Sequence, residues 1–203
     1  MVEVGCGPGW LTEFLLGLGY RVVAIEPCRE LVDITRERIT RFEQKYDLTL
    51  KDRFQFIIST LEELTIDERQ SIKASSVFFY ETLHHMIDER KALRYVYEML
   101  DDAGYLAIFG EGRWYPDNKE QENLMCEEMK RYGTLESPFT HDYLRFVLET
   151  TGFNDIKFYH AVNGLFSTDD ENLTIGQAAV MQATSTQHLN TVVARRNPAS
   201  ISP

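Results

Sequence analysis

The sequence has few cysteines, and their spacing excludes a disulfide framework. The three residues, Cys6, Cys28 and Cys126, are odd in number and form no CxxC pair. Such a set favours free thiols in a reducing compartment. No apolar stretch is long enough to span a membrane, and no basic and apolar leader precedes the first strand-like segment. We therefore expect a cytoplasmic protein.

Basic residues are also in deficit. Lys and Arg total 21 against 32 Asp and Glu, which gives a formal net charge of −11. An acidic surface repels phosphate backbones and anionic lipids, so we expect neither nucleic acid nor a membrane as a partner. The 203 residues, 43% of them apolar, suit one buried core better than two. We expect a single domain over residues 1–196 and a flexible tail over 197–203, whereas the oligomeric state is not indicated.

What the sequence does contain is an alternation of apolar, strand-like runs with amphipathic helices. Strands are expected over 1–4, 21–25, 54–59, 76–80, 105–109, 156–162 and 189–194. Helices are expected after the first strand up to Gly19, and over 31–46, 88–100, 116–132 and 140–150. The inward positions of the first two helices are predicted to be Leu11, Phe14, Leu15 and Leu18, and then Leu31, Ile34, Phe42 and Tyr46. The polar stretch 163–187 fits neither pattern. The alternation predicts an α/β fold with a mostly parallel, doubly wound sheet.

A glycine-rich turn joins the first strand to the first helix. Its pattern is Glu3-x-Gly5-x-Gly7-x-Gly9, whereas a dinucleotide-binding GxGxxG motif would place its third glycine at Trp10. A bulky indole at that position argues against a pyrophosphate cradle. An NAD-dependent oxidoreductase is therefore the less favoured alternative.

The string VEVGCGPG at residues 2–9 resembles motif I of the class I S-adenosylmethionine-dependent methyltransferases. The resemblance implies that S-adenosylmethionine is the cofactor, with Glu3 near its methionine ammonium group. Gly5 and Gly7 would offer bare backbone to the ribose and the methionine chain. Glu26, at the end of the second strand, would accept hydrogen bonds from both ribose hydroxyls, although a dinucleotide-binding fold would also place an acid near here. The same two strand ends contribute the remaining expected cofactor contacts, Cys6, Gly9 and Pro27.

The resemblance extends to the adenine side and to the sheet. Thr60 stands where the family often has aspartate, and with the backbone N–H of Leu61 it would contact the adenine. An equally open alternative for Thr60 is a solvated turn. The family also implies seven strands with an antiparallel last strand. Its usual helices before the first strand are lacking, which indicates a trimmed N-terminus.

After the fourth strand, the residues from Tyr80 to His85 resemble the LHH segment of many small-molecule methyltransferases. Tyr80 and Glu81 would line the methionine side of the pocket, and Glu111 is a further pocket candidate. His84 and His85 are candidate catalytic bases, although one of them could instead hold the loop. Neighbours on an irregular turn rarely point the same way, and Glu81 has no acidic partner nearby in the sequence. We therefore expect no metal.

The segment 112–139 is expected to form a helical lid over the acceptor site. Its aromatic residues, Trp114, Tyr115, Tyr132 and Phe139, suit a sugar or a flat ring, although plain packing of the lid is the favoured alternative. The strings FYETLHH and FGE, at residues 79–85 and 109–111, resemble methyltransferases of glycan synthesis. The resemblance thus implies methyl transfer to a small-molecule or saccharide acceptor by direct in-line displacement. A non-catalytic module that binds S-adenosylmethionine is the other alternative.

Overall fold

Parallel strands that alternate with helices form the first half of the chain. The computed structural model describes residues 1–112, 114, 117–161, 165–167 and 189–197. The strands and helices of this half are β1 (Val2–Val4), α1 (Trp10–Gly17), β2 (Val22–Ile25), α2 (Arg29–Tyr46), β3 (Phe54–Ile57), α3 (Ile66–Ser71), β4 (Ala74–Tyr80), α4 (Glu89–Met99) and β5 (Leu100–Gly112). Two 3-10 turns, η1 (Leu61–Glu63) and η2 (Leu83–His85), follow β3 and β4.

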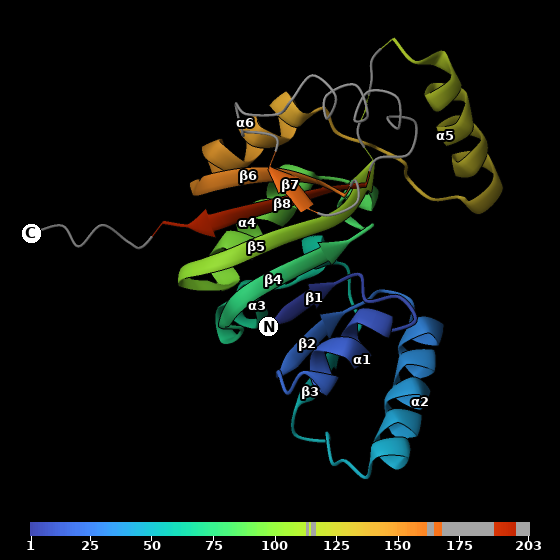
Figure 1. The fold of residues 1–203 in the computed structure, drawn as a ribbon, viewed down its shortest axis with the longest axis vertical. Helices are drawn as coiled ribbons and strands as arrows, with labels where there is room; N and C mark the ends of the chain where they lie inside the picture. The colour runs from blue at the N-terminus through green and yellow to red at the C-terminus, as the bar shows by residue number, and fades with distance from the viewer. Residues whose placement is uncertain (113, 115–116, 162–164, 168–188, 198–203) are drawn as a thin grey trace, which may run out of the picture.

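The second half adds antiparallel strands to the same sheet. Its elements are α5 (Lys119–Tyr132), α6 (His141–Thr151), β6 (Phe153–Ala161), β7 (Leu165–Ser167) and β8 (Leu189–Arg196). The last strand, β8, enters between β5 and β6 and is antiparallel to both, which gives the order β3-β2-β1-β4-β5-β8-β6-β7 (Figure 1).

This topology confirms the predicted doubly wound α/β sheet with its antiparallel last strand. The short edge strand β7 is an addition, which brings the described residues to eight strands. It lies in the stretch 163–187, which matches neither the strand nor the helix pattern in the sequence. The rest of that stretch lies outside the described residues, as do residues 198–203 of the expected tail.

Each face of the sheet has its own core. On one face, α3, α4 and α6 cover the sheet and enclose Val77, Phe79 and Leu106, all fully buried. On the other face, α1 and α2 lie over β1 to β3, where Leu16 and Ile39 pack (Figure 1). Because side chains alternate along a strand, Val77 and Phe79 of β4 face one core and Phe78 faces the other, and this explains the continuous apolar run 77–79.

The inward face of α1 differs from the prediction. Leu15 is buried as expected, but Phe14 and Leu18 are 59% and 58% exposed. Thr12 is buried instead, because its hydroxyl donates to Glu3 Oε2 beneath the helix. A satisfied hydroxyl can occupy a core position at little cost. The helical period alone could not show which of two apolar stripes faces the sheet.

The inward face of α2 differs from the prediction for the same reason. Its buried residues are Val32, Thr35 and Ile39, whereas Ile34 and Tyr46 are 48% and 52% exposed. Thr35 donates its hydroxyl to the carbonyl of Gly7 over 2.9 Å, which fastens the helix to the glycine turn. As with Thr12 in α1, a threonine occupies an inward position of the helix because its hydroxyl forms a hydrogen bond there.

Helix ends agree closely with the sequence. The side chain of Asp88 caps α4 by accepting from the N–H of Lys91, and Thr140 caps α6 by accepting from the N–H of Tyr143. Gly152, with a φ of 109°, ends α6 in the left-handed conformation. None of the described helices is long and apolar enough to cross a bilayer.

Candidate functional site

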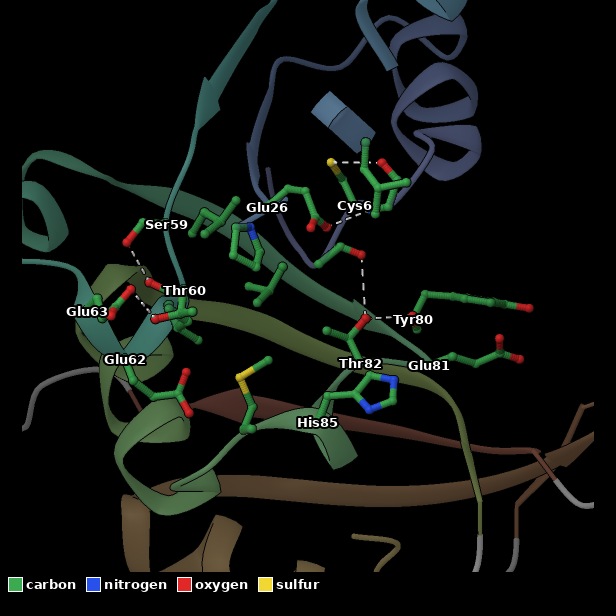
Figure 2. Close-up of a pocket in the computed structure, with 18 of the residues that line it drawn as sticks. Cys6, Glu26, Ser59, Thr60, Glu62, Glu63, Tyr80, Glu81, Thr82 and His85 are labelled. Carbon is green, nitrogen blue, oxygen red and sulfur yellow. Dashed lines mark hydrogen bonds between the residues drawn. The ribbon is translucent and has the colours of Figure 1, made fainter. Parts of the chain in front are cut away.

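A cavity of about 770 Å³ lies at the carboxyl ends of the parallel strands (Figure 2). Its walls come from the loops after β1, β2, β3 and β4, and β1 lies between β2 and β4 in the sheet. Strand order therefore reverses at this point, and open α/β sheets bind their ligands outside the carboxyl ends at such a switch point. The topology alone makes this the candidate site.

Most of the predicted cofactor contacts meet in this cavity. The residues among them that line it are Gly5, Cys6, Gly7, Glu26, Pro27, Thr60, Leu61, Tyr80 and Glu81. Glu3 and Gly9 do not line it: Glu3 is buried beneath the turn, and Gly9 is the residue before α1. Of the two histidines, His85 lines the cavity and His84 does not.

The glycines of the turn serve different purposes. A Cβ added to Gly7, whose φ is 51°, would meet nothing within 4 Å, so its backbone faces open space in the cavity. A Cβ on Gly5 would lie 2.2 Å from Thr82 Cγ2, and one on Gly9 would lie 2.1 Å from Thr35 Cγ2. Gly5 and Gly9 are therefore needed for packing. Of these three glycines, only Gly7 has open space beside its backbone. A side chain at this position would fill that space, which a bound nucleoside needs.

Glu26 is held rigidly at the edge of the cavity. It is 6% exposed, and its two oxygens accept from backbone groups, Oε2 from the N–H of Gly7 at 3.0 Å and Oε1 from the N–H of Cys28 at 2.9 Å. A carboxylate offers about four lone-pair sites, so each oxygen can accept one more hydrogen bond. The arrangement fits a ribose diol.

Glu3 supplies a buried carboxyl group beneath the turn. Burial, together with the negative charge of Glu26 and against the hydrogen bond from Thr12, raises the pKa of Glu3 to about 7. Burial likewise raises the pKa of the Cys6 thiol to about 12, so that Cys6 is a neutral wall residue rather than a nucleophile. The polar character of the turn therefore comes from the two carboxyl groups.

The loop after β3 forms the opposite wall. Thr60 donates its hydroxyl to Glu63 Oε2 at 3.0 Å, which leaves the lone pairs of its oxygen to accept from an amino group. Glu62 also lines the cavity, and its Oε1 accepts from the backbone N–H of Ile87 at 2.8 Å, tying this loop to the one after β4. Sequence reasoning singled out Thr60 and missed Glu62 and Glu63, because nothing local shows what the two acids face.

His84 is fixed by a buried carboxylate. Glu111, 2% exposed, accepts at Oε1 from the N–H groups of Thr82 and Leu83, and its Oε2 lies 2.7 Å from His84 Nδ1. Burial opposes protonation of His84, but the hydrogen bond and charge of Glu111, with the charges of Glu136 and Glu81, outweigh it and raise its pKa. Glu111 thus organises the turn after β4 and does not line the cavity.

His85 points to the cavity with a defined tautomer. Its Nδ1 lies 2.7 Å from the carbonyl oxygen of Leu135. Since a carbonyl oxygen only accepts, Nδ1 carries the proton and Nε2 is left to accept one. The imidazoles of His84 and His85 lie side by side, with ring centroids 4.0 Å apart, so the expectation that these neighbours point apart is wrong.

The aromatic residues of 112–139 do not line the cavity where the structure describes them. Phe139 is 6% exposed in the core, Tyr132 is 64% exposed, and Trp114 lies beside Phe139 through a backbone hydrogen bond. Tyr115 lies outside the described residues. The aromatic walls are instead Trp10 and Tyr80, whose rings meet edge to face with centroids 4.6 Å apart. Trp10, which in the sequence served only to exclude a dinucleotide, is thus a wall of the cavity.

Comparison with known proteins agrees with this geometry. The family model of the methyltransferase domain matches residues 2–108. The ubiquinone biosynthesis O-methyltransferase of Rattus norvegicus mitochondria is 31% identical over 108 residues, which are 53% of this chain and 29% of that protein. The match thus spans less than a third of the relative.

Solved structures show the same fold over nearly the whole chain. A methyltransferase from Thermotoga maritima aligns over 96% of this chain and 80% of its own, with a TM-score of 0.62 and 16% identity. The N-methyltransferase NodS from Bradyrhizobium japonicum, solved with S-adenosylhomocysteine, aligns over 96% of this chain and 76% of its own, with a TM-score of 0.59 and 12% identity.

Proposed function

Because the chain belongs to the methyltransferase domain family, we propose that it transfers the methyl group of S-adenosylmethionine to a small-molecule acceptor. The family confirms the predicted class I methyltransferase domain and its S-adenosylmethionine cofactor, and it argues against the NAD-dependent oxidoreductase. The narrower assignment to an LHH-containing, small-molecule group is part of the proposal. It is supported by the cavity wall at Tyr80, Glu81 and His85.

The single observation that carries the proposal is the pairing of open space at Gly7 with the carboxylate of Glu26. The bare backbone leaves room for the nucleoside and its methionine chain, and Glu26 keeps lone pairs for the two ribose hydroxyls. Thr60 and the backbone of Leu61 would meet the adenine on the opposite wall. Glu3 would act through the turn, because it contacts Thr12 and not the cavity.

When bound, the cofactor supplies a methyl group on a good leaving group, so the protein's task is mainly alignment. Proximity and orientation can lower such a barrier by roughly 7–11 kcal/mol. Trp10 and Tyr80, which contact each other edge to face, would offer the acceptor an aromatic wall that suits a planar ring or a saccharide. This pair, rather than the aromatic residues of 112–139, now supports the saccharide hypothesis.

A base is needed only where the acceptor must lose a proton. Of the two candidates, His85 is the one placed to do this, because it lines the cavity and its Nε2 is the accepting nitrogen. His84 is hydrogen-bonded to Glu111 and acts as a positioning residue for the turn after β4. Catalysis by His85 would contribute roughly 10²–10⁴-fold in rate.

We further propose that residues 112–139 cover the acceptor side of a single domain. Thr134, just after α5, lines the cavity, and the N–H of Ser137 donates to the carbonyl of His84 at 3.1 Å. These contacts bring the end of the segment to the site.

The absence of nucleic acid as a partner and the cytoplasmic location stay predictions. The free thiols of Cys6, Cys28 and Cys126 support a reducing compartment.

Calorimetry followed by turnover tests this proposal. The purified chain should bind S-adenosylhomocysteine and not NADH, and labelled S-adenosylmethionine should then transfer its methyl group to one member of a panel of phenols, amines and sugars. Binding without transfer to any of them would favour the non-catalytic module. Binding of NADH alone would overturn the family-based proposal.

A further inference from the structure

The turn after β4 and the segment after α5 bring three metal-binding side chains together. Among the described residues, His84, His85 and Glu136 each place one ligand atom within 4.8 Å of the other two. Glu136 is 52 positions from His84 in the sequence, so the group exists only in the folded chain. Glu81, the acid of the same segment, has no acidic partner nearby in the sequence, and for this reason the sequence alone does not indicate a metal.

Each histidine lies at ligand distance from one oxygen of Glu136, and the ligand atoms of the three residues lie within 4.8 Å of one another. Glu136 Oε2 lies 3.4 Å from His84 Nε2, and Glu136 Oε1 lies 3.6 Å from His85 Nδ1. Zinc binds imidazole nitrogen and carboxylate oxygen at about 2.0–2.2 Å, which places tetrahedral ligands about 3.3–3.5 Å apart. To share an ion, the two imidazoles must approach a common point beside Glu136, and His85 must give up its hydrogen bond to Leu135. A fourth position would remain open.

Glu111 completes the pattern behind His84. A histidine that binds a metal usually donates its other ring N–H to a carboxylate, which fixes the tautomer and the ring. His84 Nδ1 lies 2.7 Å from Glu111 Oε2, so Nε2 is the nitrogen that faces Glu136. Glu111 is itself locked by the N–H groups of Thr82 and Leu83. The first ligand is thus oriented before any ion arrives.

Charge favours a cation at the same place. Glu111 and Glu136 contact the imidazole of His84, Glu81 is close enough to influence its charge, and the side chains of His84 and Glu136 are only 14% and 16% exposed. The carboxylates around the two imidazoles create a negative field that attracts a cation, and one divalent ion would neutralise it. Nitrogen and oxygen donors together suit Zn²⁺ better than Mg²⁺ or Ca²⁺.

We propose that His84, His85 and Glu136 bind a divalent transition-metal ion of the Zn²⁺ type, with Glu111 as the outer carboxylate. The ion would join the segment after α5 to the turn after β4, in addition to the backbone bond from Ser137 to His84. Binding at Nδ1 of His85 displaces the proton that this nitrogen now donates to Leu135, and the neutral ring regains one proton from solvent at Nε2, so that the ring changes tautomer without a change of charge. The metal form would therefore present a donor to the cavity where the metal-free form presents an acceptor.

Cobalt spectroscopy tests this site without any need for methyl transfer. The wild-type chain, stripped with a chelator and titrated with Co²⁺ at mildly alkaline pH, should show the intense visible bands of a four- or five-coordinate ion, and Zn²⁺ should displace them. Glu136→Gln should lose the bands. The matched control is Glu128→Gln, which removes the same charge from an exposed position of α5 and should keep them.

A second variant tests the outer carboxylate. Glu111→Gln should weaken Zn²⁺ affinity by roughly 10–100-fold, the usual effect of removing such a partner. Binding of S-adenosylhomocysteine in chelator confirms that each variant is folded, so failure of the metal site and failure of the proposed function are separable. A pale, six-coordinate Co²⁺ spectrum for the wild type would overturn the proposal. Equal Co²⁺ affinity in Glu136→Gln and Glu128→Gln would overturn it as well.

Discussion

The backbone N–H of Gly7 donates to Glu26 Oε2 over 3.0 Å, and this bond ties the glycine turn after β1 to the end of β2. Gly7, which leaves space for a ligand, is therefore held in a fixed position relative to Glu26, the residue proposed to bind the ribose of the ligand. Neighbouring parallel strands end side by side, so two short sequence signals build one rigid wall. The cofactor side of the cavity depends on this pair.

Replacing Glu26 should weaken cofactor binding severely. Glu26→Ala removes the proposed acceptor for two ribose hydroxyls, and hydrogen bonds to a charged group contribute roughly 1.5–3 kcal/mol each. The dissociation constant of S-adenosylhomocysteine, measured by calorimetry, should therefore rise by about 100-fold or more. Asp33→Ala, an exposed acid of α2, is the control and should leave the affinity unchanged. Equal affinities in both variants would show that the ribose lies elsewhere.

Adding one methyl group at Gly7 should separate binding from folding. In Gly7→Ala the new Cβ meets no protein atom within 4 Å, so the fold is expected to lose only the roughly 1–2 kcal/mol of a left-handed alanine. The methyl group would, however, occupy the cradle and abolish binding of S-adenosylhomocysteine. Gly5→Ala should instead destabilise the fold, because its Cβ would lie 2.2 Å from Thr82. Thermal denaturation and calorimetry on both variants give the comparison, and tight binding by Gly7→Ala would contradict it.

Features that depend on nearby residues were predictable from the sequence. The strands, the helix caps at Asp88 and Thr140, and the placement of Gly7 and Glu26 at adjacent strand ends all follow from local pattern and from the rules of parallel sheets. The turn glycines show the limit. Gly5 and Gly7 look alike in the sequence, yet only the fold reveals that Thr82 takes the space beside Gly5.

Features that depend on distant residues were not predictable. His85 is oriented by Leu135 and His84 by Glu111, and no spacing in the sequence joins these pairs. Pairing across 50 or 27 positions depends on where β5 and the segment after α5 run. The prediction that the two imidazoles point apart failed for this reason. The position of Glu136 beside them likewise follows from the fold and from no local pattern.

Glu3 should make stability depend on pH. Its pKa is about 7 in the folded protein, against an ordinary glutamate value of 4.5 in the unfolded chain, because burial and the charge of Glu26 disfavour ionisation. The folded chain therefore holds the proton more tightly than the unfolded chain. The stability from neutral Glu3 is fully present below pH 4.5 and is lost as the pH rises through about 7.

Glu3→Gln, which mimics the neutral acid, provides the measurement. The free energy of unfolding of this variant, relative to the wild type, should rise by about 3 kcal/mol between pH 4.5 and 7.5 at 1.36 kcal/mol per pKa unit, as an order of magnitude. Urea denaturation across this range would show it. A constant difference between variant and wild type would mean that Glu3 titrates as an ordinary glutamate.

His85 should affect turnover and not cofactor binding. For an acceptor that must lose a proton, His85→Gln removes the accepting Nε2 and should lower kcat by roughly 10²–10⁴-fold. The assay is run in chelator, so that no bound metal alters the tautomer. S-adenosylhomocysteine affinity should stay at the wild-type value, because none of the predicted cofactor contacts is changed. An unchanged kcat would show that alignment alone drives the reaction.

The two faces of α1 give a stability test of the fold. Leu16 is 1% exposed in the core between α1, α2 and the sheet, whereas Phe14 is 59% exposed on the opposite side. Leu16→Ala leaves a cavity and should lower the free energy of unfolding by about 2–5 kcal/mol. Phe14→Ala removes a larger side chain but mostly from water, and should change stability by about 0.5 kcal/mol. Urea denaturation with a shared m-value gives both numbers. If Phe14→Ala were the more costly substitution, the inward face predicted from the helical period would be the right one, and the described packing of α1 would be wrong.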